Sequence, residues 1–158
     1  MVAQQCVPFV LRESHTLNVL QSRLHGLDHW FRVWKNALLL GGSDHSVDME
    51  VVAMYALFHD SMRLNDAEDL GHGIRGFRLY ERYKQVHPEV DRIFHHRQEE
   101  KLFDACAAHS DGDRSTDPTI AVCWDADRLD LHRKAIWPDA RFMSTQEAIS
   151  LTMNRIIC

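Results

Sequence analysis

Apolar residues recur along most of the chain at the spacing of amphipathic helices. The stretch from about residue 9 to residue 24 repeats them at near-helical intervals and stops before Gly26. Its apolar positions are Val10, Leu17, Leu20 and Leu24. A second stripe runs from His29 to Leu40 and ends at a pair of glycines, with Asp28 as the expected cap at its start. The first 40 residues therefore predict two helices.

The segment from about residue 48 to residue 59 is apolar almost all round. Valine, methionine, tyrosine, leucine and phenylalanine fill nearly every position of VVAMYALF, and no polar face interrupts them. A helix of this kind is stable only when neighbouring elements cover all of its sides. We expect this helix to lie in the centre of the domain.

The second half of the chain continues the helical pattern after a polar segment. The sequence SMRLNDAEDLGHG shows no apolar period and predicts a loop of about ten residues, a length often found at functional sites. Helices are expected at about 74–86 and 90–107, with His87-Pro88 separating them, and at 118–131 after Pro118. A last helix should follow a capping box formed by Ser144 and Glu147.

Strand signals are weak everywhere, so the predicted fold class is all-α. We expect a compact, single-domain helical bundle of about six to eight helices. The length of 158 residues and the 45% of hydrophobic residues suit one domain spanning 1–158, with a core large enough to be stable. Neither a disordered nor a fibrous chain has this composition.

The charge and the cysteines exclude several classes of function. A net charge of −5 and the lack of a dense basic run argue against bulk nucleic acid as a partner, although a few converging arginines could still bind a small phosphorylated ligand. The four cysteines form no C-x-x-C pair, which favours a reduced, cytoplasmic compartment. No apolar run approaches the length of a membrane span, so no membrane partner is expected.

Histidine is the unusual component, with eleven copies scattered along the chain. The central helix ends in Phe58-His59-Asp60, and a carboxylate at the end of so apolar a helix needs a cation or several donors nearby. The same argument applies to the acids of WDADRLD, and His29 lies on an amphipathic helix. The candidate set comprises His29, His59, Asp60 and Asp127. Two nitrogens and two oxygens suit a divalent ion such as Mn, Mg, Fe, Ni, Co or Zn.

The order of these motifs resembles that of the HD-domain superfamily of metal-dependent phosphohydrolases. The resemblance covers roughly residues 20 to 135: His29 is followed by Arg32-Val33, then F-H-D stands at 58–60 and D-A-D-R-L-D at 125–130. It implies that His29, His59, Asp60 and Asp127 are metal ligands, and that Asp125 is only a neighbour.

The resemblance leaves the number of ions open at one or two. Relatives with a second metal use further histidines between the HD pair and the last acid, where this chain has His72 and His109. Relatives with one metal often carry acids shortly after the HD pair, and Asp66, Glu68 and Asp69 stand there. We expect one firmly held ion and a second, weaker one, with His72 and His109 either ligating it or acting on the substrate.

The function that the resemblance implies is hydrolysis of a phosphate ester or anhydride on a small molecule, with a nucleotide as the expected substrate and metal-activated water as the nucleophile. Candidates for proton transfer are His72, His109 and Asp130. Candidates for holding the phosphate are Arg63, Arg75 and Arg128. His25, which precedes Gly26, is expected to be a helix-end residue outside the site.

Two other functions stay open at this point. Some relatives of the superfamily hold two irons and perform oxygen-dependent cleavage, and a non-catalytic module that binds a metal or a nucleotide is the third reading. The apolar residues of the last helix belong either to the core or to the surface of a homodimer. They are Ile149, Leu151, Met153, Ile156 and Ile157.

Overall fold

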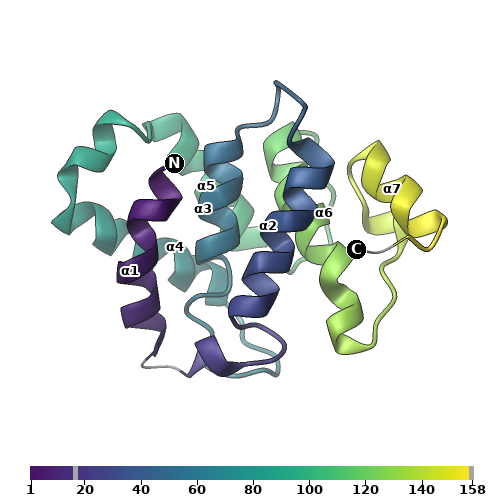
Figure 1. Cartoon of the computed structure of the whole chain (residues 1–158), viewed down its shortest axis with the longest axis horizontal. Coiled ribbons are helices and arrows are strands. Elements are labelled where there is room, and N and C mark those ends of the chain that lie inside the picture. The colour runs from purple at the N-terminus through teal and green to yellow at the C-terminus, as the bar shows by residue number, and fades with distance from the viewer. Residues whose placement is uncertain (16–17, 157–158) are drawn as a thin grey trace.

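The computed structural model describes residues 1–15 and 18–156, and the regular secondary structure of this part of the chain is helical. The α-helices are α1 (Val2–His15), α2 (Leu27–Gly41), α3 (Met49–Phe58), α4 (His72–Val86), α5 (His96–Ala108), α6 (Pro118–Leu129) and α7 (Gln146–Met153) (Figure 1). Short 3-10 helices lie at Val19–Gln21, Pro88–Arg92, Asp130–Lys134 and Ala140–Phe142. The described residues form no β-strand, which confirms the predicted all-α bundle.

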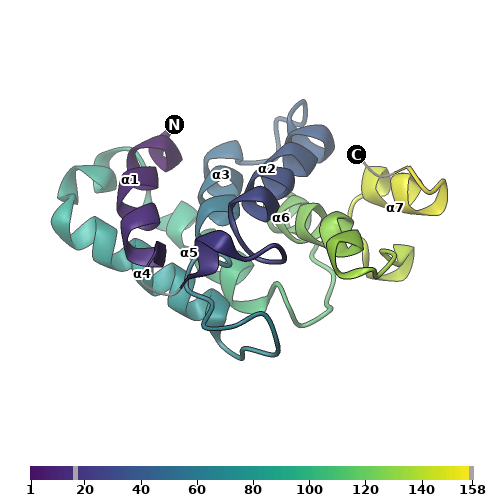
Figure 2. The same ribbon diagram turned by 60° about the horizontal axis from the view of Figure 1, so that its bottom comes forward.

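Helix α3 occupies the middle of the bundle, as its apolar sequence predicts. It packs against α1, α2, α5 and α6, and α2 runs along α6. Figures 1 and 2 show α1 and α4 at one end of the molecule and α7 at the other. The segments that carry the chemical motifs, α2, α3 and α6, are therefore neighbours in the central part of the fold.

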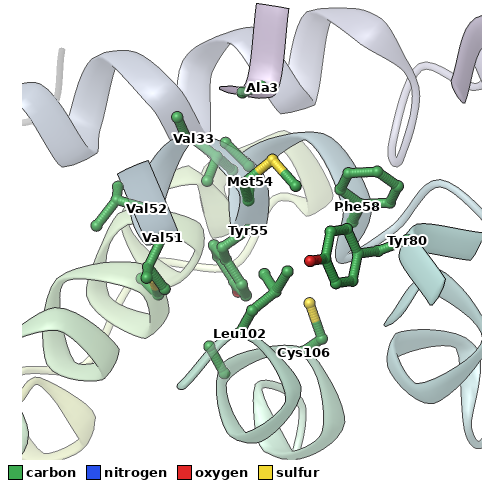
Figure 3. Close-up of a cluster of buried hydrophobic side chains, with 14 of the residues drawn as sticks. Ala3, Val33, Val51, Val52, Met54, Tyr55, Phe58, Tyr80, Leu102 and Cys106 are labelled. Atoms are coloured by element: carbon green, nitrogen blue, oxygen red, sulfur yellow. The ribbon is translucent and has the colours of Figure 1, made fainter. Parts of the chain in front are cut away.

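The core is built around the side chains of α3. Figure 3 shows them against residues of the surrounding helices, with Val33 from α2, Tyr80 from α4, and Leu102 and Cys106 from α5. Met54, Tyr55 and Phe58 are fully buried. Burying one large apolar side chain contributes roughly 1.5–3 kcal/mol, so this cluster is a major part of the folding free energy. It also fixes the position of the residues that follow Phe58.

The N-terminal helix differs from its prediction at both ends. It begins at Val2 rather than near residue 9, continues through Pro8, and ends at His15; Leu17 lies outside the described residues. Ala3, Cys6 and Val10 form one buried face, whereas Pro8 lies on the exposed side. A proline inside a helix costs about 3 kcal/mol. The burial of this face offsets that cost.

Two predicted caps are wrong by one or two positions. Helix α2 has Gly26 as its N-cap, and Asp28 lies in its first turn instead. Helix α7 is capped by Thr145, whose side chain accepts a hydrogen bond from the N–H of Ala148. The hydroxyl of the predicted cap Ser144 instead accepts a hydrogen bond of 3.1 Å from the N–H of Ser115. Tertiary contacts thus decide which of two adjacent hydroxyl residues caps the helix.

The helix predicted over 90–107 is divided in the structure. A 3-10 helix at Pro88–Arg92 is followed by α5, which begins at His96 with a capping box between His95 and Gln98. Val90 and Phe94 are fully buried, and the break lets both reach the core. Helix α4 begins at His72, two residues before the predicted start, so that His72 is helical rather than part of the loop.

The cysteines and the lengths of the helices can be stated for the described residues. Cys6, Cys106 and Cys123 are free and buried, and Cys158 lies outside the described residues. Within 1–15 and 18–156, every helix is too short or too polar to cross a membrane. Ile157 of the last apolar stretch is also outside the described part, while Met153 and Ile156 are exposed. The homodimer stays a prediction.

Candidate metal centre

Three helices bring four sequence-predicted residues to one place. His29 lies in the first turn of α2, His59 and Asp60 follow α3 directly, and Asp127 lies on α6. Nε2 of His29 is 3.1 Å from Nε2 of His59, 3.4 Å from Oδ2 of Asp60 and 3.3 Å from Oδ1 of Asp127. We call His29, His59 and Asp127 the first group. All of it is buried or nearly so, in the centre of the bundle.

A second group of possible metal ligands adjoins the first, and its carboxylate, Asp60, also faces the first group. Oδ1 of Asp60 is 3.1 Å from Nε2 of His72, the first residue of α4, and 3.8 Å from Nε2 of His109, which follows α5. The two Nε2 atoms are 2.9 Å apart. Asp60, His72 and His109 form the second group. Because Oδ2 faces His29 and Oδ1 faces His72, Asp60 connects both groups.

The Nδ1 atom of each of the four histidines has a hydrogen-bond acceptor on the side of the ring opposite the centre. Nδ1 of His59, His72 and His109 contacts the backbone carbonyl oxygens of Tyr55, Asp69 and Cys106, at 3.1, 2.6 and 2.7 Å. Nδ1 of His29 is 2.7 Å from Oδ2 of Asp130. A carbonyl or carboxylate oxygen only accepts, so each Nδ1 carries a proton and donates it. Each neutral imidazole then presents an Nε2 lone pair to the centre.

This arrangement requires positive charge. Two Nε2 lone pairs face each other in each pair of histidines, and the neighbouring carboxylates are also acceptors. Buried acceptors that lack a donor cost free energy. Nη1 of Arg63, which lies 3.1 Å from Nε2 of His72, and a proton on one imidazole satisfy part of this need, and a divalent cation in each group would satisfy the remaining lone pairs.

The pKa values of the histidines reflect this competition. Burial works against the charged form of His29, but the carboxylates of Asp127, Asp130 and Asp60 outweigh it and raise its pKa to about 10. Burial lowers the pKa of His59 to about 3. The pKa of His109 is raised because Asp60 outweighs its burial. The neighbouring carboxylates therefore favour the protonated form of one histidine in each pair.

The carboxylates of the centre are ionised. Burial disfavours the charge of Asp60, yet His59, His109, His29 and His72 together hold its pKa well below the usual range. The pKa of Asp127 is also well below the usual range, because His29 and the positive charge of Arg133 outweigh the effect of burial. Both acids can therefore serve as anionic ligands at neutral pH.

The residues of both groups fit a divalent metal ion. Within each group the ligand atoms lie within 4.8 Å of one another, a distance that one ion can span. The first group offers two nitrogens and one oxygen, and the second offers the same types, with an oxygen of Asp60 available to each. Mixed imidazole and carboxylate sets bind Mn, Fe, Co, Ni and Zn. The predicted set of His29, His59, Asp60 and Asp127 is thus assembled, with His72 and His109 beside it.

Glycines let α4 bring His72 to its place. A Cβ atom on Gly73 would collide with the carbonyl oxygen of Cys106 on α5, and one on Gly76 would collide with that of Phe58 on α3. The close approach of the three helices puts His72 next to His109, with ring centroids 4.7 Å apart. The second group therefore depends on backbone contacts that only glycine permits.

Asp130 lies behind His29 rather than in contact with solvent. It is fully buried, and besides Nδ1 of His29 it accepts a hydrogen bond of 2.6 Å from Nε of Arg32. Burial raises the pKa of Asp130, but His29 and Arg32 outweigh burial and lower it. A carboxylate in this place fixes the tautomer and the orientation of a ligand histidine. This role differs from the proton transfer predicted for Asp130.

A cavity of about 330 Å³ opens beside the two groups. Asp60, His109 and Asp127 line one part of it, and basic side chains line another. Of the arginines predicted to hold a phosphate, Arg63 and Arg128 line this cavity. Arg75 does not, because its guanidinium is bonded to the loop through Asp69 and the carbonyl oxygens of residues 62 and 70. The structure thus brings two of the three predicted arginines to the site.

The acids that follow the HD pair lie away from the two groups. Asp66 contacts Ser22 and Nδ1 of His25, and Asp69 accepts hydrogen bonds from the N–H of Leu64 and from Arg75. Glu68 is exposed. None of the three belongs to a group of described residues that could hold an ion. His72 and His109 occupy that position instead.

Three further residues that line the cavity were not predicted from the sequence to belong to the site. His25, predicted to lie outside the site, is fully buried and lines the cavity, as do Arg133 and Lys134. Nη2 of Arg133 is 3.4 Å from Oδ1 of Asp127. The basic pair directly after the acidic motif is a signal that could have indicated the two cations. No local signal identifies His25.

Comparison of the chain with protein-family models, with curated proteins and with solved structures returned no match. The likeness to the HD-domain superfamily therefore depends on the order of histidines and acids in this sequence. The geometry of the two groups is an independent observation, since it follows from how the helices pack and not from any relative. Membership in that superfamily stays a prediction.

Proposed function

We propose that the protein is a metal-dependent phosphohydrolase that acts on a small phosphorylated molecule, with a nucleotide as the expected substrate. The single observation that carries the proposal is the placement of the shared carboxylate. Asp60 gives one oxygen to each of two histidine groups, and it also lines a cavity with basic side chains. A cation centre beside an anion-binding wall suits a phosphate ester.

The ligand side chains define where ions would be held. His29, His59 and Asp127 would hold one ion and His72 and His109 another, with Asp60 serving both. When bound, a divalent ion lowers the pKa of water to about 7 and polarises a phosphoryl oxygen. Asp130 keeps the proton of His29 on Nδ1, which leaves the Nε2 lone pair directed at the ligand cluster.

The basic residues of the cavity would bind and orient the phosphate. Arg63 and Arg128 are nearly buried, and backbone carbonyl oxygens hold both guanidinium groups in fixed positions. Fixed cations stabilise charge that develops on the phosphoryl oxygens without reorganising during the reaction. The volume of about 330 Å³ is at the lower end of ligand pockets, which supports a small substrate.

The test combines elemental analysis with a hydrolysis panel. Untagged protein should contain one or two equivalents of a divalent metal, and it should hydrolyse members of a panel of nucleotides and other small phosphate esters. Asp127→Ala should lose both the first ion and hydrolysis, while Asp104→Ala, which changes an exposed acid of α5, should retain both. If Asp127→Ala keeps its metal and its activity, the proposed centre is wrong.

Oxygen-dependent chemistry on two irons is a second candidate. Four imidazole nitrogens converge on the centre, and imidazole is a good ligand for iron. Oxygen consumption by ferrous-loaded protein, with no phosphate release from the panel, would favour it. Tight nucleotide binding without either reaction would instead favour a non-catalytic binding module.

A further inference from the structure

Besides the two metal-ligand groups, the cavity is lined by residues that carry polar atoms without hydrogen-bond partners. Lys134 lines the cavity, and its ammonium group has no ion pair or hydrogen bond within the described part of the chain. Burial, together with the positive charge of Arg133, lowers the pKa of Lys134. Nη1 of Arg133 is buried and also lacks a hydrogen bond, since Oδ2 of Asp130 is 3.7 Å away. These donors favour an anion beside them.

His25 adds an acceptor to the same cavity. Its side chain is fully buried, and its Nε2 has no partner among the described residues. Nδ1 is 2.9 Å from Oδ1 of Asp66, a half-exposed acid that lies outside the cavity. The carboxylate only accepts, so Nδ1 donates to it, and the opposite edge of the ring presents Nε2. Buried next to the cations Arg63 and Lys134, His25 is neutral and Nε2 is a lone pair.

A buried acceptor without a partner, in the same cavity as an ammonium group without a partner, indicates the kind of ligand. Phosphate oxygens pair with the cations but repel a lone pair, whereas a hydroxyl group donates to it. A ligand that satisfies both must therefore carry an anionic group and an alcohol close together. The small size of the cavity limits such a ligand to a compact molecule.

We propose that His25 and Lys134 form a specificity subsite for the phosphate ester of a small polyhydroxy compound, such as a sugar. In this subsite Nε2 of His25 accepts a hydrogen bond from a substrate hydroxyl, and the ammonium group of Lys134 binds a phosphate oxygen. The assignment rests on the proposed function, because it takes the phosphate to lie beside the metal-ligand groups. Arg133, which is held by Asp127 and the carbonyl oxygen of Leu24, adds positive charge beside the phosphate.

The test measures binding rather than turnover. Manganese-loaded protein is titrated calorimetrically with the phosphonate analogue of ribose 5-phosphate and with pentylphosphonate; neither has a phosphate ester bond that water can cleave. We expect the hydroxylated ligand to bind roughly tenfold more tightly, because pentylphosphonate leaves the acceptor of His25 unpaired. Equal affinities of the unaltered protein for the two ligands would overturn the proposal without any variant.

Variants of His25 and Lys134 test which residue causes the preference for the hydroxylated ligand. His25→Phe should remove the preference between the two ligands, whereas His25→Gln, which keeps an acceptor, should retain part of it. Lys134→Gln should lower the affinity for both ligands by a similar factor of roughly ten. The control Lys35→Gln, on an exposed part of α2, should leave both affinities unchanged. A preference that survives His25→Phe in folded protein would contradict the assignment.

The outcomes separate this proposal from the proposed function. If the ligand preference is found and depends on His25 but no phosphate ester is hydrolysed, the subsite stands and the phosphohydrolase does not. If esters are hydrolysed while the two phosphonates bind equally, the phosphohydrolase stands and the subsite does not.

Discussion

The two metal-ligand groups share Asp60 but differ in what surrounds them. In the first group, His29 is supported by the buried carboxylate of Asp130, and Asp127 adds a second negative charge. In the second group, carbonyl oxygens support both histidines, and Nη1 of Arg63 lies 3.4 Å from Oδ1 of Asp60 and 3.1 Å from Nε2 of His72. The second group therefore already has a cation beside it.

The surroundings of the two groups predict unequal affinities for a metal ion. A carboxylate behind a ligand histidine makes it more basic, whereas a neutral carbonyl does so less. A guanidinium group repels a second cation and partly neutralises the carboxylate that would bind it. We expect the first group to bind an ion firmly and the second group to bind one weakly.

The largest effect is expected from the residue that both groups share. Asp60→Asn keeps the size of the side chain but leaves one oxygen, no charge and an NH2 donor, so it cannot serve both groups. The affinity for both ions should fall by more than about 100-fold, measured by titration with Mn²⁺ against a competing chelator. Asp104→Asn is the control and should bind normally. Loss of only one ion would show that Asp60 does not connect the groups.

A smaller effect, confined to the first group, is expected from Asp130→Asn. The amide still fits beside His29 but is neutral, so the affinity for the first ion should fall by about 10- to 100-fold. The affinity for the second ion should stay the same. Asp125→Asn, a buried acid of α6 that accepts from the N–H groups of residues 144 and 145, should leave both affinities unchanged. Equal losses of affinity for both ions would contradict the proposed difference between the two groups.

Removing the positive charge of Arg63 should raise, rather than lower, the affinity of the second group for its ion. Arg63→Gln should raise the affinity for the second ion by roughly tenfold, because the repulsion between the guanidinium group and the ion disappears. The affinity for the first ion should change little. Arg78→Gln, on the exposed side of α4, is the matched control. A lower affinity for the second ion would mean that Arg63 supports that site instead.

The smallest effect is expected outside both groups, at the cap of α6. Asp117 accepts hydrogen bonds from the N–H groups of residues 119 and 120 and pairs with Lys101 at 2.8 Å. Asp117→Ala should lower the free energy of unfolding by about 1 kcal/mol near neutral pH, measured by urea denaturation, and should leave metal affinity unchanged.

The pH dependence of this effect has a definite sign. Burial raises the pKa of Asp117, but Lys101 and the backbone N–H groups outweigh burial and lower it below its usual value. A lowered pKa in the folded state adds stability above the unfolded pKa of about 3.9 and loses it as the pH falls through the folded value. The difference between the unaltered protein and Asp117→Ala should therefore shrink in acid. A difference that grows in acid would contradict this account.

Much of the fold follows from local pattern, and the errors have local causes. The periodic apolar positions of α2, α3 and α6 predict those helices closely, because their buried faces repeat along the chain. The predictions fail where a tertiary contact overrides a local signal. Pro8 stays inside α1 because its helix buries one face, and Ser144 does not cap α7 because its hydroxyl accepts a hydrogen bond from the N–H of Ser115.

The ligand set shows the same division. His59 and Asp60 could be selected from the sequence because they end an apolar helix and need compensation. The choice of Asp127 among the acids of its helix depended on the resemblance to the HD-domain superfamily. The placement of His72 and His109 was open, because it depends on the close approach of α4 at Gly73 and Gly76. The supporting role of Asp130 was hidden, since it depends on a contact across 101 positions of the chain.

The sequence by itself determined the helical class, the central position of α3 and the residue types that demand a cation. These depend on periodicity and on the free energy of burying charge, which act at each position. Only the tertiary structure decided that one carboxylate serves two groups, that Arg63 lies beside the second, and that His25 lines the cavity. Such features depend on distances between helices far apart in sequence, and no local pattern records them.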